Sequence, residues 1–513
     1  AETNAEKFNL MLAGGDYPDL VNGMDYTGGN DLAVESDFAI NLADDIAEYA
    51  PNYENIINSD PSIVKTITTD EGNIVAFYTF NSEKQGTTEG AWIRGDWLED
   101  LGLENPKTYD QWENVLTAFK NEKGAEEPLM MPSDMVPSGN FLASGFGMGA
   151  AAHLAGVREG RRVLKPLSEL WGEGNPWGDV LSGWIPDREL LCSRRNGPAS
   201  QLALLLARQA VEDAGWGREE LRDAALIVGS SRGNASGWLS PWPGRRPMKI
   251  LAVPNSLHSE LASCVSIELG ICGPYHVLAS GCAAGLDAVG MAAMLMRQGV
   301  VKRALAIGLD LPLCRELLGT YWASGMLSRN GLNDPYGPLA DGMCISEGGA
   351  AIALELSSAP GIYVKDYLVN SDAYSPLGMP EDGKSIAALL EAALKSRDGA
   401  VPLTVCPHAS GTAGNSVSER AALKRVFKDG LPDLRMMKPW TGHAIGGSGI
   451  LELALMLVFA REGVLPPNPP WATFPEGGAC SAEELPLAGG RMLVKSAASM
   501  GGHNVVLSLV VDG

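Results

Sequence analysis

The sequence predicts an α/β fold in which helices are layered around mixed or mostly parallel sheets. Apolar runs at residues 224–229, 299–308 and 348–355 are typical of buried strands. Helical patterns alternate with them, such as residues 198–214, where apolar side chains recur every fourth residue. With 513 residues, the chain is long enough for two or more domains.

The distribution of charge divides the chain into two units. Residues 1–146 hold 27 acidic and 7 basic residues, a balance of −20, whereas the remaining residues hold 35 and 32, a balance of −3. All eight cysteines and all six histidines follow residue 146. We therefore expect two units of different origin, with the boundary near residue 146. The acidity argues against nucleic-acid binding, which needs a basic surface.

The composition, 45% hydrophobic and 20% charged, indicates a globular protein. No run approaches the roughly 18 apolar residues of a membrane helix, and the start of the chain lacks the pattern of a signal peptide. The eight cysteines form no C-x-x-C pair, which argues against a disulfide framework or a zinc site. These features predict a reducing, cytoplasmic location.

The stretch 278–297 carries the strongest candidate for a catalytic group. An apolar run ends in a Ser-Gly turn, Cys282 follows, and the next fifteen residues predict a buried helix. A cysteine in the first turn of a helix faces unpaired N–H groups and the positive end of the helix dipole. We expect Cys282 to favour the thiolate and act as a nucleophile, although a small core cysteine would give the same local pattern.

Four further pieces accompany Cys282, and they are rich in glycine and in groups that donate or transfer protons. They are the loop 335–350, the segment Pro407-His408-Ala409-Ser410-Gly411-Thr412 with Asn415 and Glu419, the segment Lys438-Pro439-Trp440-Thr441-Gly442-His443 with Gly446–Gly449 and Glu452, and the turn Gly501-Gly502-His503-Asn504. The run Gly446–Gly449 lacks the Gly-Lys-Ser/Thr ending of a phosphate-binding loop.

In this order and at these separations, the pieces resemble those of the β-ketoacyl synthases, the condensing enzymes of fatty-acid and polyketide assembly, over residues 147–513. The resemblance implies a thiolase-like five-layered α-β-α-β-α domain of two related halves, which we place at 147–395 and 396–513. It implies the catalytic residues Cys282, His408, His443 and Lys438. The oxyanion and pocket residues that it implies are Met500, Gly501, Gly502, Thr412 and Glu452.

The implied reaction is a decarboxylative Claisen condensation without a metal or other cofactor. The thiolate takes an acyl group from a carrier thioester, and malonyl thioester then loses CO2 to give an enolate stabilised by the two imidazoles. The enolate carbon attacks the acyl-cysteine, and the amides of Cys282 and Met500 stabilise the oxyanion. Lys438 would orient this network.

The implied partners are an acyl carrier protein, with its phosphopantetheine-linked acyl and malonyl groups, and a second ketosynthase subunit in a homodimer or heterodimer. Because acyl carrier protein is acidic, a local basic patch is needed. The candidates are Arg158, Arg161, Arg162 and Lys165, or Lys424, Arg425 and Lys428.

Several positions depart from the family pattern. Ala340 replaces a common arginine, Ser416 a common aspartate, and Met500 a bulky aromatic gate, with Ala498 and Ser499 before it. His503 stands where a hydroxyl residue is usual, and we interpret it as structural or pocket-shaping. A flexible methionine gate could admit an unusual acyl chain. The segment 141–147 supplies only a stub of the family's first strand, so we expect a weakened sheet edge.

The first unit carries a second, partial resemblance. The segments 12–20, 41–45 and 92–109 resemble an extracellular sugar-type solute-binding protein of an ABC importer, and the resemblance stops near Gly145. It implies an incomplete solute-binding-protein-like α/β segment fused before the ketosynthase, either by gene fusion or by an assembly artefact.

Three alternatives to a catalytic ketosynthase remain. The first is a non-catalytic partner of the chain-length-factor type, which the presence of Cys282 disfavours. The second is a thiolase, which needs a second cysteine near the C-terminus; Cys480 lies in an acidic, loop-like stretch away from the Gly501 turn. The third is a sugar-type binding protein acting through residues 1–146.

Overall fold

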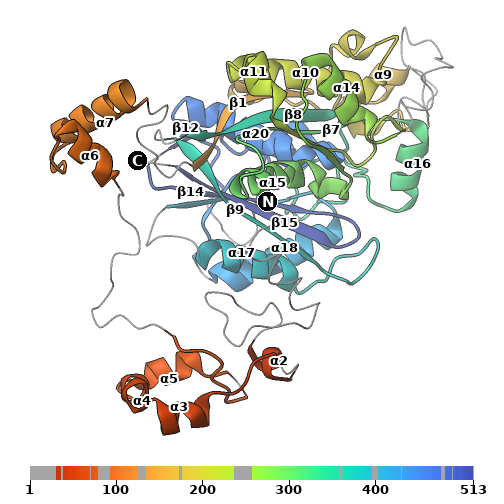
Figure 1. Ribbon diagram of the computed structural model, residues 1–513. Helices are drawn as coiled ribbons and strands as arrows, with labels where there is room; N and C mark the ends of the chain where they lie inside the picture. Colours follow the sequence, from red (N-terminus) through yellow and green to blue (C-terminus); the bar gives the residue numbers. More distant parts are fainter. Residues whose placement is uncertain are drawn as a thin grey trace. The chain divides into compact units, whose positions relative to one another are not determined.

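The protein is described by a computed structural model that covers residues 30–35, 38–69, 71–78, 93–124, 134–172, 176–235, 257–357, 361–395, 402–428, 430–474, 480–487 and 489–511. The chain divides into two compact units, Ala1–Leu129 and Met130–Gly513 (Figure 1). In these described ranges, no helix combines the length and the apolar character needed to cross a membrane.

The first unit is helical where it is described. Its helices are α2 (Asn30–Glu35), α3 (Ala43–Tyr49), α4 (Pro51–Ile57), α5 (Pro61–Ile67), α6 (Gly95–Leu101) and α7 (Tyr109–Lys123). They pack around two small apolar clusters, one centred on Ile46 and Ile57 and the other on Val115 and Phe119. The described residues of this unit contain no strand, so the expected α/β character is not seen there. The predicted motif at 12–20 lies outside the described residues.

The second unit is built on two sheets. The first has the strand order β2-β1-β8-β7-β5-β6 and the second β11-β10-β14-β15-β9. The strands of the first sheet are β1 (Asp134–Ser144), β2 (Gly147–Met148), β5 (Ala225–Gly229), β6 (Tyr275–Leu278), β7 (Arg303–Asp310) and β8 (Gly348–Ser357). Those of the second are β9 (Ile362–Ser371), β10 (Leu403–Cys406), β11 (Asp433–Leu434), β14 (Met492–Ala498) and β15 (His503–Val511).

The two sheets repeat one pairing scheme. In the first, β5 is parallel to both β6 and β7, and β8 is antiparallel to β7 and β1. In the second, β10 is parallel to both β11 and β14, and β15 is antiparallel to β14 and β9. The predicted domain of two related halves therefore agrees with this repeated topology.

Helices complete five layers (Figure 1). Helices α15 (Ala284–Arg297) and α20 (Ser448–Arg461) lie between the sheets, where α15 contacts β5, β7 and β9 and α20 contacts β8 and β14. Helices α10 (Pro198–Asp213) and α14 (Glu260–Leu269) cover the outer face of the first sheet, and α17 (Lys384–Lys395) and α18 (Ala413–Phe427) that of the second. Because α20 meets protein on all sides, its residues 448–460 are all buried.

Shorter elements connect these layers. They are α8 (Ala150–Arg158), β3 (Lys165–Pro166), α9 (Ser168–Trp171), β4 (Leu181–Ser182), η1 (Arg188–Leu191), α11 (Arg218–Arg222), η2 (Gly281–Ala283), α16 (Arg315–Ala323), α19 (Lys438–Thr441), η3 (Ile445–Gly447), β12 (Val464–Leu465) and β13 (Leu485–Pro486).

The expectation of a stub at the first strand is wrong. β1 has 11 residues and pairs with β8 from Asp134↔Ser357 to Ala143↔Gly349, with one bulge between Pro137 and Gly139. Among the described residues, β2 pairs only with the last two residues of β1, so Pro137, which has no N–H to donate, is paired with β8 alone. The strand, and with it the sheet, therefore begins N-terminal to the predicted boundary at residue 146.

One residue of β1 is poorly suited to its position. Asn140 is buried, and neither side-chain polar atom has a hydrogen-bond partner. Its substitution by valine would remove two unpaired polar atoms and add a residue favoured in strands, so we expect Asn140→Val to stabilise the second unit by about 1–2 kcal/mol. Urea unfolding checks this value, and a lower unfolding free energy than that of the wild type would contradict it.

Candidate active site

Cys282 lies where the two halves of the second unit meet. It occupies η2, which leads directly into α15, and the preceding Gly281 has a positive φ of 62° that favours glycine. The corresponding segment of the second half is η3, which leads into α20, and η2 and η3 are in contact. The repeated topology thus brings two helix N-termini together, and one of them carries the sulfur.

The expected thiolate is not the resting state of Cys282. Burial raises the pKa of its thiol to about 11, although Lys438 and Arg232 act to lower it. The sequence indicated the helix N-terminus correctly, but it could not indicate that the sulfur is only 6% exposed and loses its hydration. Cys282 is therefore a thiol at neutral pH.

This raised pKa has a direct chemical consequence. Since only the thiolate reacts, the rate of alkylation of Cys282 by iodoacetamide should rise about tenfold per pH unit between pH 7 and pH 9. Peptide mass spectrometry measures modification at Cys282, and the exposed Cys272 provides an internal reference in the same digest. A rate that levels off below pH 8 would contradict the raised pKa.

The two predicted histidines lie beside this sulfur. The Sγ of Cys282 and one ring nitrogen each of His408 and His443 are within 4.8 Å of one another. The two imidazole rings are 5.5 Å apart between centroids and are inclined at 81°. Burial lowers the pKa of both histidines well below 6.5, with a further contribution from the neighbouring Lys438, so both rings are neutral at neutral pH.

Hydrogen bonds fix which ring nitrogen carries the proton. The Nδ1 of His443 accepts the N–H of Ile445 at 3.0 Å, and Ser448 Oγ lies 3.1 Å from the same atom. The Nδ1 of His408 faces the Nζ of Lys438, a donor, at 3.4 Å. Because each Nδ1 accepts a hydrogen bond, the proton of each neutral ring is on Nε2. Both rings thus present an N–H donor rather than a base.

A cysteine and two histidines could also ligate a soft metal ion, and these three are the only such group among the residues that the structure describes. A metal needs the thiolate and an unprotonated ring nitrogen from each histidine. Binding a metal here would require loss of the thiol proton and of the proton on each Nε2, whereas the metal-free arrangement presents hydrogen-bond donors that suit an anion.

Two buried lysines share one buried carboxylate behind the histidines. The Nζ of Lys438 donates to Glu452 at 2.6 Å and to the carbonyl oxygen of His408 at 2.5 Å. Lys495 lies 3.0 Å from the other oxygen of Glu452 and donates to the carbonyl of Pro407. Lys438 therefore positions the His408 segment directly. Lys495, in the middle of apolar β14, is a member of this network that the sequence analysis missed.

Two further carboxylates hold the backbone of the site. Glu419 accepts the N–H groups of His408 and Ala409, at 2.7 and 2.8 Å. Asp310, at the end of β7, accepts the N–H groups of Arg232 and Gly446 at 2.9 and 2.7 Å. Ala409 and Ile445 adopt positive φ values of 48° and 45°, rare for residues with a Cβ. These bonds therefore maintain strained segments next to both histidines.

Cys282, His408 and His443 line a cavity of about 320 Å³. The remaining lining residues are Ser324, Gly325, Met326, Met343, Leu377, Gly378, Met379, Ser410, Thr412, Ala413, Gly414, Asn415, Ile445, Ala498, Ser499 and Met500. Four methionines contribute to this wall, which gives it flexible, apolar side chains. Of the predicted pocket residues, Thr412 and Met500 line the cavity, while Glu452 lies behind it.

The predicted oxyanion residues follow β14 in a tight turn. Gly501 and Gly502 have φ values of 87° and 83°, which explains the glycine at both positions. The N–H of Cys282 is not open to the cavity, because it donates to the Oγ of Ser499 at 3.2 Å. His503 lies outside the cavity lining, where its Nε2 is 3.0 Å from Asp287 and the carboxylate raises its pKa.

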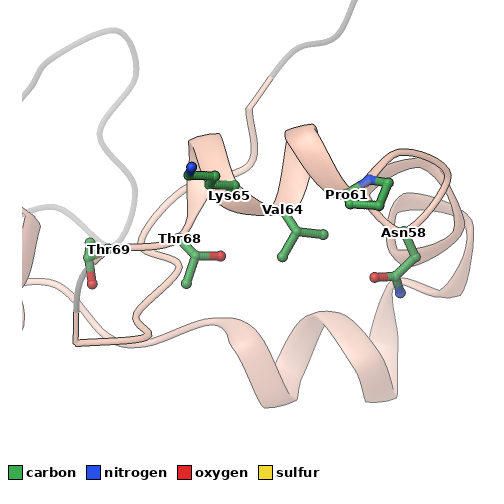
Figure 2. Close-up of a pocket in the computed structure, with 6 residues that line it drawn as sticks. All are labelled: Asn58, Pro61, Val64, Lys65, Thr68 and Thr69. Carbon is green, nitrogen blue, oxygen red and sulfur yellow. The ribbon is translucent and has the colours of Figure 1, made fainter.

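The first unit has a larger but chemically poorer hollow, of about 650 Å³ (Figure 2). It is lined by Asn58, Pro61, Val64, Lys65, Thr68 and Thr69. Figure 2 shows Val64, on α5, and Thr68, just after its end, pointing towards the same open space. Lys65 is its only titratable group, and no aromatic ring is in its lining. This hollow does not have the convergent polar and aromatic groups of a built binding site.

Comparisons with known families match the second unit. A model described as the β-ketoacyl synthase N-terminal domain matches residues 185–359, and a model described as the C-terminal domain matches residues 362–471. Together the two matches cover more than half of the chain.

Curated relatives are similar over the same region. The chain is 29% identical over 369 residues to the tetracenomycin polyketide synthase ketoacyl synthase alpha subunit of Streptomyces glaucescens, which covers 63% of this chain and 83% of that protein. It is 27% identical over 359 residues to 3-oxoacyl-[acyl-carrier-protein] synthase 1 of Escherichia coli K12, which covers 65% of this chain and 87% of that protein.

Solved structures share the fold. A type II polyketide ketosynthase complex with its acyl-carrier protein, AntDE:AntF, superimposes with a TM-score of 0.63 at 21% identity, covering 74% of this chain and 100% of that chain. The ishigamide ketosynthase/chain length factor gives a TM-score of 0.63 at 22% identity, covering 75% of this chain and 100% of that chain.

Proposed function

We propose a two-step reaction at Cys282 for this chain, which belongs to the β-ketoacyl synthase family and is a condensing enzyme of the acyltransferase type. The observation that carries the assignment of residues is the cluster of the Cys282 Sγ and one ring nitrogen from each of two imidazoles within 4.8 Å. Fatty-acid and polyketide synthases both occur among the relatives, so the proposal covers either pathway.

In the first step, Cys282 takes an acyl group from the thioester of an acyl carrier protein. The bond from Cys282 Sγ to the acyl carbon forms, the bond to the carrier sulfur breaks, and the thiol proton ends on the carrier thiol. The helix N-terminus at η2 stabilises the developing charge on sulfur. Desolvation by the apolar cavity wall opposes the free thiolate, so deprotonation is coupled to attack.

In the second step, malonyl thioester enters and loses CO2. The Nε2–H groups of His408 and His443 donate to the thioester oxygen, on which negative charge develops as the carbon–carbon bond breaks. The enolate carbon then attacks the acyl carbonyl on Cys282 and expels the sulfur, which regains a proton from solvent. The products are the 3-ketoacyl thioester on the carrier, CO2 and the free thiol.

Sequential addition of the two thioesters tests this course. Intact-mass spectrometry should detect one acyl adduct after exposure to an acyl carrier thioester, and peptide mapping should place it on Cys282. Addition of malonyl carrier protein should then discharge the adduct and release one CO2 for each 3-ketoacyl product. A folded enzyme that forms no adduct would refute the proposal.

The carrier protein is proposed to dock near the C-terminal end of α18. Both predicted basic patches are exposed, but the side chains of the patch at 158–165 already have partners: Arg158 pairs with Glu484, Arg161 pairs with Glu159, and Arg162 stacks on Trp471. Lys424, Arg425 and Lys428 are exposed. Residues 413–415 at the start of α18 line the cavity, about 16 Å from Lys424 along the helix axis. A flexible phosphopantetheine arm could span that separation.

Charge reversal tests this docking site. The double variant Lys424→Glu/Arg425→Glu should raise the KM for acyl carrier thioester about tenfold or more, because it opposes an acidic partner. It should leave acylation by a small N-acetylcysteamine thioester unchanged, because that reagent makes no carrier contact. Arg218→Glu, an exposed charge reversal on α11, is the matched control. An unchanged KM for carrier would contradict the site.

A second subunit is proposed to pair with the exposed edge of the first sheet. β6 is the edge strand, and its Tyr275 is 43% exposed. Ile267 on α14 and Met294 on α15 are also exposed. Within the described part of the chain β6 pairs only with β5, and such a strand edge beside apolar side chains is suited to strand pairing with a second ketosynthase subunit. A non-catalytic chain-length-factor role is disfavoured by the buried thiol between two histidine donors.

For the first unit, we retain the proposal of a fragment related to solute-binding proteins. Its support is the sequence resemblance of residues 41–45 and 92–109. Titration of the full chain with a panel of oligosaccharides, followed by tryptophan fluorescence, tests whether this fragment also binds a sugar. The aromatic-free lining of the hollow in Figure 2 predicts no saturable change.

A further inference from the structure

Ser499 makes a contact with the nucleophile that the reaction scheme above does not use. Its Oγ accepts the N–H of Cys282 at 3.2 Å and lies 3.1 Å from the carbonyl oxygen of Met500, to which it donates. The residue is 3% exposed and lines the cavity. A serine hydroxyl with both an N–H donor and a carbonyl acceptor is fully engaged at this position.

The contact between Ser499 and residues 281–282 is close, and hydrogen bonds hold the backbone of Ser499 in place. A Cβ built on Gly281 would lie 2.0 Å from Ser499 Oγ, so the hydroxyl fills the space that a side chain at residue 281 would take. The N–H of Ser499 donates to the carbonyl of His503 at 2.9 Å, and its own carbonyl accepts the N–H of Gly502 at 3.0 Å. With the backbone bonded on both sides, only rotation of the side chain can move the hydroxyl.

The N–H of Cys282 has a chemical role in any acyl transfer to its own sulfur. The carbonyl oxygen of an acyl group on Sγ becomes an oxyanion when the tetrahedral intermediate forms, and it needs a donor within hydrogen-bond distance. The backbone N–H of the same residue, at a helix N-terminus, is a nearby unshared donor once the hydroxyl leaves. In the resting enzyme, the oxygen of Ser499 occupies that place.

We propose that Ser499 is a positioning residue that closes the oxyanion site at Cys282 until an acyl thioester displaces its hydroxyl. The proposal rests on the function proposed above, because it concerns the rate of acyl transfer at the same sulfur. Ser499 competes with the substrate oxygen for one N–H group, so it slows formation of the acyl-enzyme and its later attack by the enolate. Its hydroxyl bonds to Cys282 and Met500 and, among the described residues, to neither imidazole, so we expect it to leave decarboxylation of malonyl thioester unaffected.

Measuring acylation and decarboxylation separately distinguishes this role from a general structural one. With hexanoyl-N-acetylcysteamine as the acyl probe, Ser499→Ala and Ser499→Gly should form the Cys282 adduct about 3- to 10-fold faster than the wild type, the equivalent of one net hydrogen bond. With malonyl-N-acetylcysteamine, the rate of CO2 release should not change. Ser508→Ala, on the same hairpin and bonded to Asp366 instead, should acylate at the wild-type rate.

Three results would overturn the inference. Acylation at or below the wild-type rate in both Ser499 variants would mean that the hydroxyl does not compete, or that it donates to the oxyanion. An equal change in acylation and in CO2 release would indicate a general disturbance of the cavity. If the wild type itself takes no acyl group, the proposed function and this inference both fail, whereas slow acylation confined to the Ser499 variants contradicts the inference alone.

Discussion

Cys282→Ala is expected to abolish condensation and to leave decarboxylation in place. Without Sγ there is no acyl acceptor in the cavity, and loss of a covalent nucleophile lowers turnover by roughly 10⁴-fold or more. The two histidines that act on malonyl thioester are positioned by Ile445, Glu419 and Lys438 rather than by the sulfur. CO2 release from malonyl carrier protein should therefore continue while no 3-ketoacyl product forms.

Intact-mass spectrometry and CO2 release measure these two outcomes on one sample. The matched control is Cys272→Ala, which removes an exposed cysteine and should keep the adduct and the product. An acyl adduct that persists in Cys282→Ala would place the nucleophile on another cysteine. Loss of CO2 release along with condensation would show that the sulfur also supports the enolate, contrary to the division of roles proposed here.

Glu452→Ala is expected to cause the largest loss of stability. The carboxylate is fully buried and pairs with Lys438 at 2.6 Å and with Lys495 at 3.0 Å, and both lysines are themselves buried. Removing one partner of a buried ion pair leaves an uncompensated charge, at a cost of about 3–5 kcal/mol. Here two ammonium groups lose their shared partner, and burial alone already lowers the pKa of Lys438.

Urea unfolding measures the loss, and hydrogen exchange of α20 assigns it to the second unit. Glu484→Ala breaks an exposed pair with Arg158 and should cost only about 0–1 kcal/mol. Glu452→Gln keeps the shape and one acceptor oxygen, and should fall between the two. A loss below about 1 kcal/mol in Glu452→Ala would mean that the lysines are held mainly by the carbonyls of His408 and Pro407.

The periodic spacing of apolar residues predicts many of the strands and helices. The predicted strands at 224–229, 299–308 and 348–355 correspond to β5, β7 and β8, and the helix at 198–214 corresponds to α10. These elements are buried on their expected faces, so the apolar pattern in the sequence records their environment. β1 was misjudged because Pro137 and Gly139 interrupt the apolar pattern, and the bulge that accommodates them depends on pairing with distant β8.

The sequence predicts which residues form the site, but it does not predict their pKa shifts or hydrogen-bond partners. The motifs placed Cys282, His408, His443 and Lys438, and the structure brings them together. Lys495 escaped notice because a single lysine in an apolar strand resembles an exposed position until Glu452 is seen beside it. The contact of Cys282 with Ser499 joins residues 217 apart, and the pKa of Cys282 is raised by its burial in the fold; no local pattern encodes either.

The pairing of β1 with β8 also affects how the protein folds during its synthesis. Asp134 pairs with Ser357, so the nascent chain must grow by 223 residues before the strand finds its partner. At about 5–20 residues per second on the ribosome, this wait lasts roughly 10–45 seconds. During that interval Phe141 and Leu142, later packed in the core, have no sheet to cover them. A nascent chain stopped before residue 348 lacks β8, so the apolar side chains of β1 have no partner strand and are available to chaperones.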